Sequence, residues 1–198
     1  MKSSKRKFSF ILFIVVIGFH NFSFSQASLG LKTGAGIFSI QSELKSKSMF
    51  AWEAGFFSYA DLSDKINLQP EIDFSDKGGE VSFADSSYTI HLQSANMRFI
   101  VSYLFNDHFS AGAGPYFSYM FMARQNKELV PKSWYSPFGV GLNVAASAYA
   151  GDWIFSIRYD KSLSLLTRDN DVEISKSFNP LKGSHVNGFS LVVCVGFD

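Results

Sequence analysis

The 198-residue chain carries 18 lysine and arginine residues against 17 aspartate and glutamate residues, which gives a formal net charge of +1. This balance argues against a nucleic-acid partner, and a charged fraction of 18% is low beside the roughly 25% usual for soluble domains. The single cysteine, Cys194, excludes an internal disulfide.

The N-terminus has the three parts of a secretory signal peptide. Phe8–Phe19 is an apolar segment, and Ser23-Phe24-Ser25 is a small-x-small cleavage site. Four basic residues precede the apolar segment, and residues 1–25 contain no acidic residue. The basic residues are Lys2, Lys5, Arg6 and Lys7. The alternative, a transmembrane helix, needs roughly 20 apolar residues, and this segment is shorter. We therefore predict a signal peptide over residues 1–25 and a β-barrel domain over residues 26–198, with a net charge of about −3 after cleavage.

Beyond the signal, eight segments alternate between apolar residues and small or polar ones, with the period of a β-strand. The clearest is Asn187–Asp198, where Phe189, Leu191, Val193 and Val195 share one face with Phe197. The other seven are Leu29–Ile40, Phe50–Phe57, Ile66–Ser75, Thr89–Phe105, Phe109–Phe121, Phe138–Tyr149 and Trp153–Asp160. In Thr89–Phe105 the phase of the alternation changes, which predicts a β-bulge near Ser94–Asn96.

The connections between these segments alternate in length. Those after the second, fourth and sixth segments are short, whereas those after the odd segments are longer and polar, the longest being Ser164–Val186. This arrangement predicts an all-β fold, an eight-stranded antiparallel up-and-down transmembrane β-barrel of the outer-membrane type, with both termini in the periplasm. The alternative is a soluble sandwich or lipocalin-like barrel, but its outward face would be charged. Here the face opposite the apolar one is too rich in glycine for that.

Several motifs resemble those of a known family. Leu68-Gln69-Pro70-Glu71-Ile72, followed by Asp76-Lys77-Gly78, resembles a strand signature of the PorT-like outer-membrane β-barrel family, which is common in Bacteroidota. Three more segments resemble other strands of that family: Leu29–Gly34, Ala113–Ser118 and Ser156–Asp160. The resemblance implies a place in the bacterial cell envelope, in the outer membrane, and permits a role in secretion.

The inward face of the expected barrel carries charges of both signs. They are Lys32, Glu53, Glu71, Asp73, Arg98, Arg158 and Asp160. Buried charges are costly unless they are paired, so we predict ion pairs that plug the lumen, since an eight-stranded barrel has room only for side chains. Glu71 and Asp73 lie two apart on one strand, and Arg98 on the next strand is their expected counter-charge, with Lys32, Arg158 and Asp160 also available. The alternative is a path for protons or ions. Inward glycines at Gly34/Gly36, Gly112/Gly114 and Gly139/Gly141 make room for large neighbours such as Tyr116 and Tyr149.

The sequence predicts no catalytic, cofactor or metal site. Asp169, Asp171 and Glu173 do not have the spacing of a calcium loop. A hydrolase would need a nucleophile, a base and an acid together; the candidates are His91, Ser94, Ser184 and His185, and no nucleophile elbow surrounds them.

We therefore expect a non-enzymatic outer-membrane barrel with a binding role or a role in envelope assembly or secretion. Its expected partners are outer-membrane lipid, the barrel-assembly machinery during biogenesis, and a protein or ligand at the extracellular loops. The alternative is an enzyme that modifies lipid A or phospholipid, as a hydrolase or acyltransferase.

Overall fold

The computed structural model describes residues 28–42, 45–83, 86–129, 131, 135–166 and 184–197, so the predicted signal peptide and its cleavage site lie outside the described residues. No helix within these ranges is long and apolar enough to cross a membrane. The described chain forms nine strands: β1 (Ser28–Gln41), β2 (Lys45–Ser63), β3 (Ile66–Phe83), β4 (Ser86–Asn106), β5 (Phe109–Gln125), β6 (Glu128–Leu129), β7 (Phe138–Ala150), β8 (Trp153–Ser162) and β9 (His185–Phe197).

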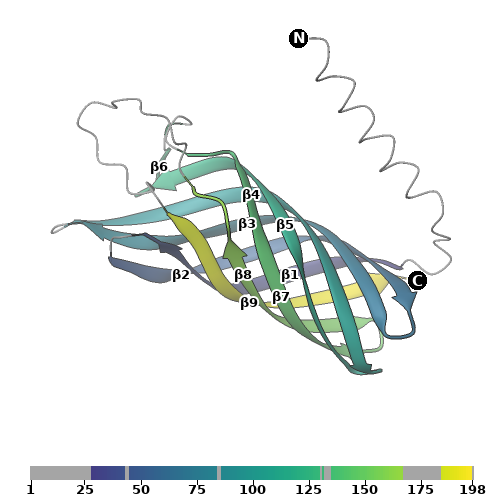
Figure 1. The fold of residues 1–198 in the computed structure, drawn as a ribbon. Helices are drawn as coiled ribbons and strands as arrows, with labels where there is room; N and C mark the ends of the chain where they lie inside the picture. Colours follow the sequence, from purple (N-terminus) through teal and green to yellow (C-terminus); the bar gives the residue numbers. More distant parts are fainter. Residues whose placement is uncertain are drawn as a thin grey trace, which may run out of the picture.

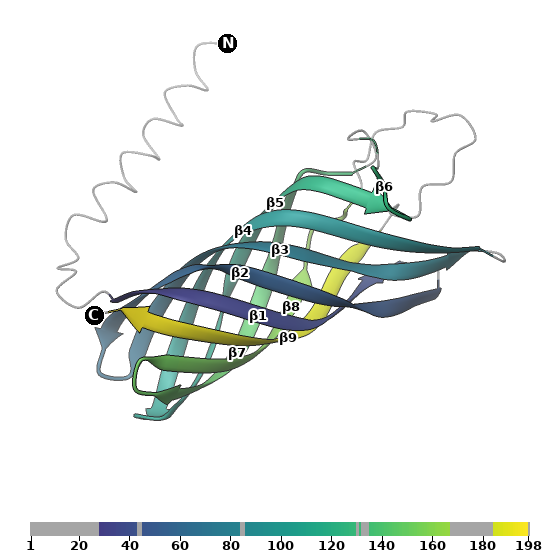
Figure 2. The same cartoon turned by 180° about the vertical axis from the view of Figure 1, so that it is seen from behind.

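Eight of these strands close into a ring (Figures 1 and 2). All neighbours are antiparallel, in the order β4-β3-β2-β1-β9-β8-β7-β5, and β5 pairs with β4 to complete the circle. The short β6 only extends β5 as a hairpin. At the seam between β1 and β9, Leu29 pairs with Phe197. The predicted eight-stranded up-and-down barrel is thus confirmed, and closure removes the free sheet edges that a lipid environment does not tolerate.

The strands are staggered around the barrel. A path around the ring can be followed from Ser162 of β8 by moving from each residue to its partner on the next strand. This path comes back next to the start of β8, at Asp152, ten residues before the residue at which it began. It passes through Gly141, Tyr116, Arg98, Glu71, Phe57, Gly30 and Gly196. A stagger of this kind requires strands that are tilted against the barrel axis, typically by about 35–45°. Side chains from distant strands therefore meet at one height inside the barrel.

The two ends of the barrel differ. At one end, tight turns at residues 64–65, 107–108 and 151–152 join the strands, as predicted. At the other end the prediction of long loops was wrong for the first two connections, because β2, β3 and β4 continue outward as paired strands. Residues 42–44 alone link β1 to β2, and residues 84–85 alone link β3 to β4. The long connection is the one between β8 and β9.

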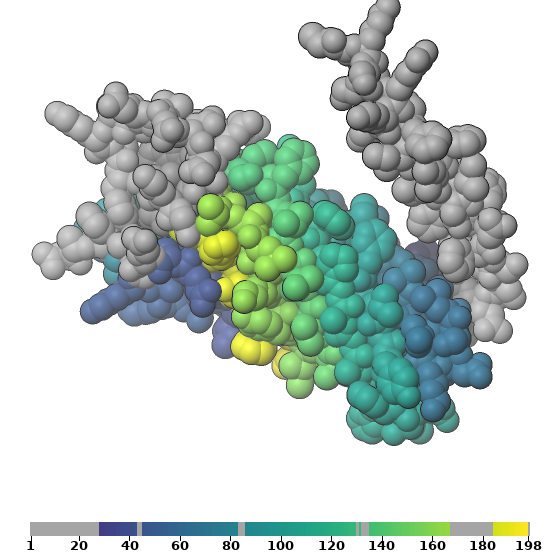
Figure 3. All heavy atoms as spheres, in the orientation of Figure 1, coloured from purple at the N-terminus to yellow at the C-terminus, as the bar shows by residue number. Residues whose placement is uncertain are grey.

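The outward face is apolar and exposed, which fits a barrel surrounded by lipid. Ile157 is 60% exposed and Leu191 is 64% exposed, and in Figure 3 the side chains of β5, β7, β8 and β9 form a continuous outer surface. Many exposed aromatic side chains lie toward both ends of the apolar band. The lower girdle, near the tight turns, contains Tyr103, Phe105, Phe109, Trp153 and Phe197; the upper girdle contains exposed Phe50, Trp52, Phe74, Tyr119, Phe121, Phe138 and Phe189, together with half-buried Tyr159.

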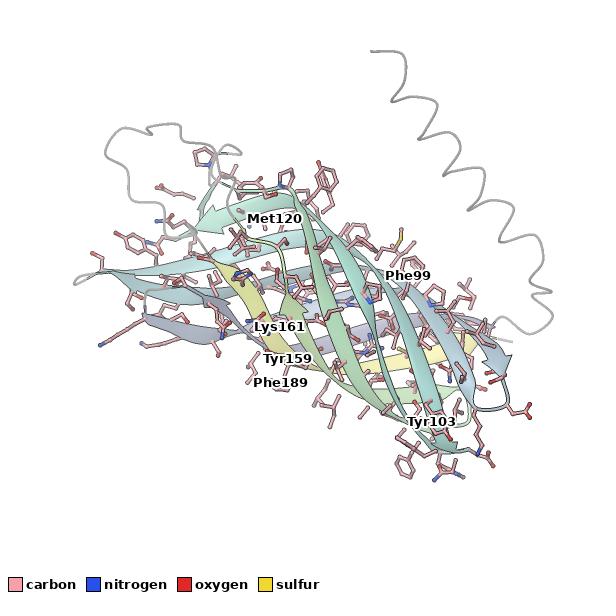
Figure 4. The ribbon with its side chains drawn as sticks, viewed as in Figure 1. Phe99, Tyr103, Met120, Tyr159, Lys161 and Phe189 are labelled. Carbon is pink, nitrogen blue, oxygen red and sulfur yellow. The ribbon has the colours of Figure 1, made fainter. Side chains whose placement is uncertain are left out.

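Aromatic rings pair within each girdle. Tyr103 packs edge-on against Phe105, with ring centroids 5.7 Å apart, and Tyr159 packs against Phe189 at 4.8 Å. Figure 4 shows Tyr103 near the end with the tight turns, and Tyr159 with Phe189 nearer the other end. Girdles of this kind mark the two membrane interfaces of outer-membrane barrels.

The predicted bulge lies on the strand next to the expected one. From Thr89 to Tyr103, β4 alternates without interruption, because Ile90 and Leu92 point inward together with Ser94. The irregularity is on β5: Gln93 pairs with Met122 but Ser94 pairs with Met120, so Phe121 is the extra residue. The sequence pattern of β4 changes phase because this end of the barrel interior is apolar, and the backbone itself does not slip.

Candidate functional site

The inward face brings together all seven predicted charged residues and one more, Lys77. These eight side chains, which we call the lumen charge network, come from five strands: Lys32 (β1), Glu53 (β2), Glu71, Asp73 and Lys77 (β3), Arg98 (β4), and Arg158 and Asp160 (β8). All eight residues are buried; Arg98 is 0% exposed and Lys77, the most exposed, only 9%. Four cations therefore face four anions, and the network is balanced in formal charge.

Glu71 is the centre of one half of the network. Arg158 donates two hydrogen bonds to its carboxylate in a fork, at 2.7 and 2.8 Å. Lys32 donates a third at 2.7 Å, and the Gln69 amide donates a fourth at 2.7 Å. A buried carboxylate with so many donors is well satisfied, and a forked guanidinium adds geometric specificity.

Arg98 is the centre of the other half. It donates hydrogen bonds to Asp73, to Glu53 at 2.9 Å and to Asp160 at 3.2 Å. Asn96 donates a further bond to Asp73 at 2.8 Å. The sequence placed Arg98 opposite both Glu71 and Asp73; in the structure it binds Asp73, whereas Arg158 and Lys32 hold Glu71.

Lys77 was missed as a member of the network. Its Nζ donates to Asp160 at 2.6 Å and lies 4.4 Å from the centre of the Phe38 ring. The signal was in the sequence, because Lys77 follows Glu71, Asp73 and Ser75 at a period of two. The predicted strand ended at Ser75, whereas β3 continues to Phe83.

Apolar layers fill the barrel on both sides of the network. Toward the tight turns lie Phe57, Ile154, Val192 and Cys194, with Tyr59 and Tyr149 packed against them. Toward the other end lie Ile40, Val81, Ile90, Leu92, Met120, Ala123, Tyr135 and Leu166. Cys194 is a small buried apolar residue, as the sequence indicated.

Two short segments next to the strand ends lie over the upper mouth of the barrel. They are residues 135–137 and 163–166, which we call the cap. The Ser136 amide donates to the Leu166 carbonyl at 2.7 Å, and the Leu166 amide donates to the Ser184 carbonyl at 2.8 Å. Tyr135 and Leu166 are buried in the upper apolar layer. The cap therefore covers part of the upper mouth above the network.

A cavity of about 50 Å³ remains between the network and the cap. Lys77, Ser94, Asn96, Tyr116, Met120 and Leu166 are among the residues that line it. This volume suits a few water molecules. Beside it, Gly141 makes room for Tyr116, because a Cβ atom on Gly141 would lie 2.3 Å from the tyrosine ring.

The candidate hydrolase residues do not come together. His91 lies on the outward face, with Nδ1 3.1 Å from an Asp76 carboxylate oxygen. Ser94 points into the lumen, where its hydroxyl lies 3.2 Å from that of Ser75. His185 Nδ1 lies 3.2 Å from the Ser164 carbonyl oxygen at the cap. His91 and Ser94 thus point to opposite faces of β4, and His185 lies on β9.

The candidate cation ligands Asp169, Asp171 and Glu173 lie outside the described residues. In the ranges that the structure describes, no three histidine, cysteine, aspartate or glutamate side chains are placed to hold a metal ion.

Comparison with known structures gives likenesses at low identity. Neisserial surface protein A is 14% identical, with a TM-score of 0.52, over 87% of this chain and 99% of that one. The attachment invasion locus protein Ail of Yersinia pestis is 9% identical, with a TM-score of 0.46, over 87% and 99%. The outer membrane enzyme PagL is 10% identical, with a TM-score of 0.45, over 84% and 99%. At such identities the likeness to Neisserial surface protein A concerns the fold alone.

No curated protein matches the chain. A family model described as "outer membrane protein beta-barrel domain" matches residues 4–168, most of the sequence. Its description agrees with the closed ring, the apolar outer face and the two aromatic girdles of the structure. The chain belongs to the outer membrane protein β-barrel domain family.

Proposed function

We propose that this outer-membrane barrel is a closed, non-enzymatic binding protein. The end opposite the tight turns, which we call the long end, faces the cell exterior. The observation that carries the proposal is the lumen charge network. It fills the middle of the barrel with paired charges, and apolar layers lie on both sides of it. A solute would have to break several buried ion pairs to pass, and each broken pair would leave an uncompensated charge. With no path through the barrel, its outer surfaces are left to carry the function.

The absence of catalysis is part of the same proposal. Its support is that His91 and Ser94 point to opposite faces of β4. The alternative is an enzyme that modifies lipid A or phospholipid in the outer membrane. Lipid mass spectrometry on a deletion strain distinguishes the two: the proposal expects unchanged lipid A and phospholipid species. A species that disappears on deletion and returns with the wild-type gene would replace it.

The biological role that we propose is binding at the exterior, or a part in envelope assembly or secretion. The resemblance of Leu68–Ile72 and Asp76–Gly78 to the PorT-like family of Bacteroidota supports the secretion role. Export would use the signal peptide over residues 1–25, and the barrel-assembly machinery would insert the chain. The short-turn end would then face the periplasm.

Planar-bilayer recording of the purified, folded protein tests the closed lumen. The expected result is no steady conductance at moderate voltage, with an open porin in the same bilayer as the control. A large, steady conductance of the wild-type protein would instead identify a channel.

Photo-crosslinking in intact cells tests the binding surface. Probes at exposed Leu129 and Leu165 sample the long end, and a probe at Asp107 on a tight turn is the matched control. The proposal expects a discrete adduct from the long end that the Asp107 probe does not give. Adducts only from Asp107 would place the partner in the periplasm.

A further inference from the structure

The exposed charges of the barrel are separated by sign along its axis. Near the tight turns, the exposed charged residues of the described chain are Asp61, Asp64, Asp107 and Asp152, with Lys65 as the one cation. At or beyond the upper girdle the exposed ones are Lys45, Lys47, Arg124, Lys127 and Lys161, with Glu128 as the one anion, and Asp76 and Glu80 are half-buried there. Among the exposed residues that the structure describes, cations therefore predominate in the outer half and anions in the periplasmic half.

Arg124 lies where the apolar band gives way to lipid headgroups. It pairs across the sheet with outward-facing His91, and it follows Phe121 of the upper girdle on the same strand. Phe121 in turn packs edge-on against Phe74, with ring centroids 6.5 Å apart. A lipid whose acyl chains lie against this aromatic pair would hold its headgroup beside Arg124.

Two neighbouring basic residues of this face already have carboxylate partners. Lys47 lies 3.4 Å from Glu80, and the Ser87 hydroxyl donates to the same carboxylate. The Ser87 hydrogen bond, with the Lys47 charge second, lowers the pKa of Glu80, so this carboxylate is ionised at neutral pH. His91 is likewise beside Asp76.

Arg124 and Lys127 differ from these residues. In the part of the chain that the structure describes, neither has a carboxylate within ion-pairing distance. Both are exposed, and Lys127 follows Arg124 by three residues, in the turn between β5 and β6. They form a small basic site, which we call the rim site. Glu128 follows Lys127 directly in the chain but makes no ion pair with either cation.

We propose that the rim site binds a phosphate group of the outer-leaflet glycolipid, with Arg124 as the main ligand. A guanidinium can donate two parallel hydrogen bonds to one phosphate, and Lys127 adds a second positive charge. Basic side chains next to a membrane surface attract anionic headgroups in just this way. The aromatic pair Phe74–Phe121 directly below favours a phosphate that is attached to acyl chains. The site does not depend on the lumen being closed.

Native mass spectrometry of the folded protein in detergent tests the rim site. The wild type is titrated with lipid A that carries two phosphates, with the same lipid after removal of its phosphates, and with inorganic phosphate as a competitor. The test variant is Arg124→Gln with Lys127→Gln, and the matched control is Lys65→Gln at the periplasmic end. Heat-modifiable migration on gels verifies that each variant is folded.

The expected result is an affinity for diphosphorylated lipid A that falls about fivefold for each cation removed, so about 25-fold for the double variant at low salt. The Lys65→Gln control should bind the lipid as tightly as the wild type, which would show that the loss is local. The dephosphorylated lipid should bind more weakly to the wild type, which would show that binding requires phosphate. Equal binding by the double variant, or equal binding of the dephosphorylated lipid, would overturn the proposal. Full competition by inorganic phosphate at the same concentration would also overturn it, because the site would then recognise phosphate alone.

Discussion

Glu71 and Arg158 are 87 residues apart in the chain, yet two guanidinium nitrogens of Arg158 lie 2.7 and 2.8 Å from the carboxylate oxygens of Glu71. They come from β3 and β8, which are not neighbours in the ring. Their contact therefore crosses the lumen and ties two walls of the barrel together. Both residues are almost fully buried, so neither charge has water as an alternative partner.

The first prediction concerns this pair. Arg158→Met should destabilise the barrel by about 3–5 kcal/mol, because it leaves Glu71 with Lys32 as its only cation in contact. Glu71→Gln combined with Arg158→Met should cost less than the two single changes added together. Urea unfolding in lipid bilayers measures all three variants. Strict additivity of the two single effects would show that the pair is not coupled.

The second prediction concerns the two faces of β9. Val193 pairs with Thr33 and Phe155 on the outward side, midway between the girdles, and Cys194 is fully buried inside. Val193→Arg should cost about 2–4 kcal/mol, since it places a charge in the lipid. Cys194→Ser, a small inward change beside the Gln69 amide, should cost less. If the serine variant unfolded at the lower urea concentration, the assignment of the faces would have to be reversed.

The third prediction concerns the packing of Tyr116. Gly141→Ala should destabilise by about 1–3 kcal/mol, because the added methyl overlaps the Tyr116 ring. Gly196→Ala is the matched control, since its methyl would meet only the Asp152 carbonyl oxygen at an ordinary 3.8 Å. Replacing Tyr116 by leucine in the Gly141→Ala background should restore part of the loss. Equal unfolding midpoints for the two alanine variants would contradict the packing argument.

The fourth prediction concerns export. Protein from outer membranes should begin at Gln26, which intact mass and N-terminal sequencing can determine. Ser25→Leu should slow cleavage, because the site requires small residues, whereas Ala27→Leu beyond the cut should have a smaller effect. A mature protein that retains Met1 would exclude the signal peptide.

The direction of each side chain could be predicted from the sequence because a period of two does not depend on the neighbouring strand. Leu191 and Phe189 face lipid, and Lys32 and Arg98 face the lumen, as the alternation indicated. The alternation gave the wrong direction for a side chain only where the barrel interior is apolar instead of polar. Ile90 and Leu92 are apolar and yet inward, since they belong to the upper apolar layer under the cap.

The choice of ion-pair partners could not be predicted in the same way. Adjacent strands suggested Arg98 as the partner of Glu71, whereas the stagger of ten residues brings Arg158 across the lumen to that carboxylate. Lys77 was missed because the predicted strand ended at Ser75, although Lys77 keeps the period of two and β3 continues to Phe83. Both gaps have one cause, which is that strand length and stagger are properties of the closed ring.

The seam between β1 and β9 also sets the time at which the barrel can form. β1 leaves the ribosome first of all the strands, and one of its edges has no partner until β9 follows. In lipid, each unpaired backbone group would cost several kcal/mol, so an incomplete barrel with an unpaired strand edge is unstable in the membrane. Insertion must therefore be late and concerted, and Lys32 of β1 loses its water only as the last strand arrives to shut the ring around it.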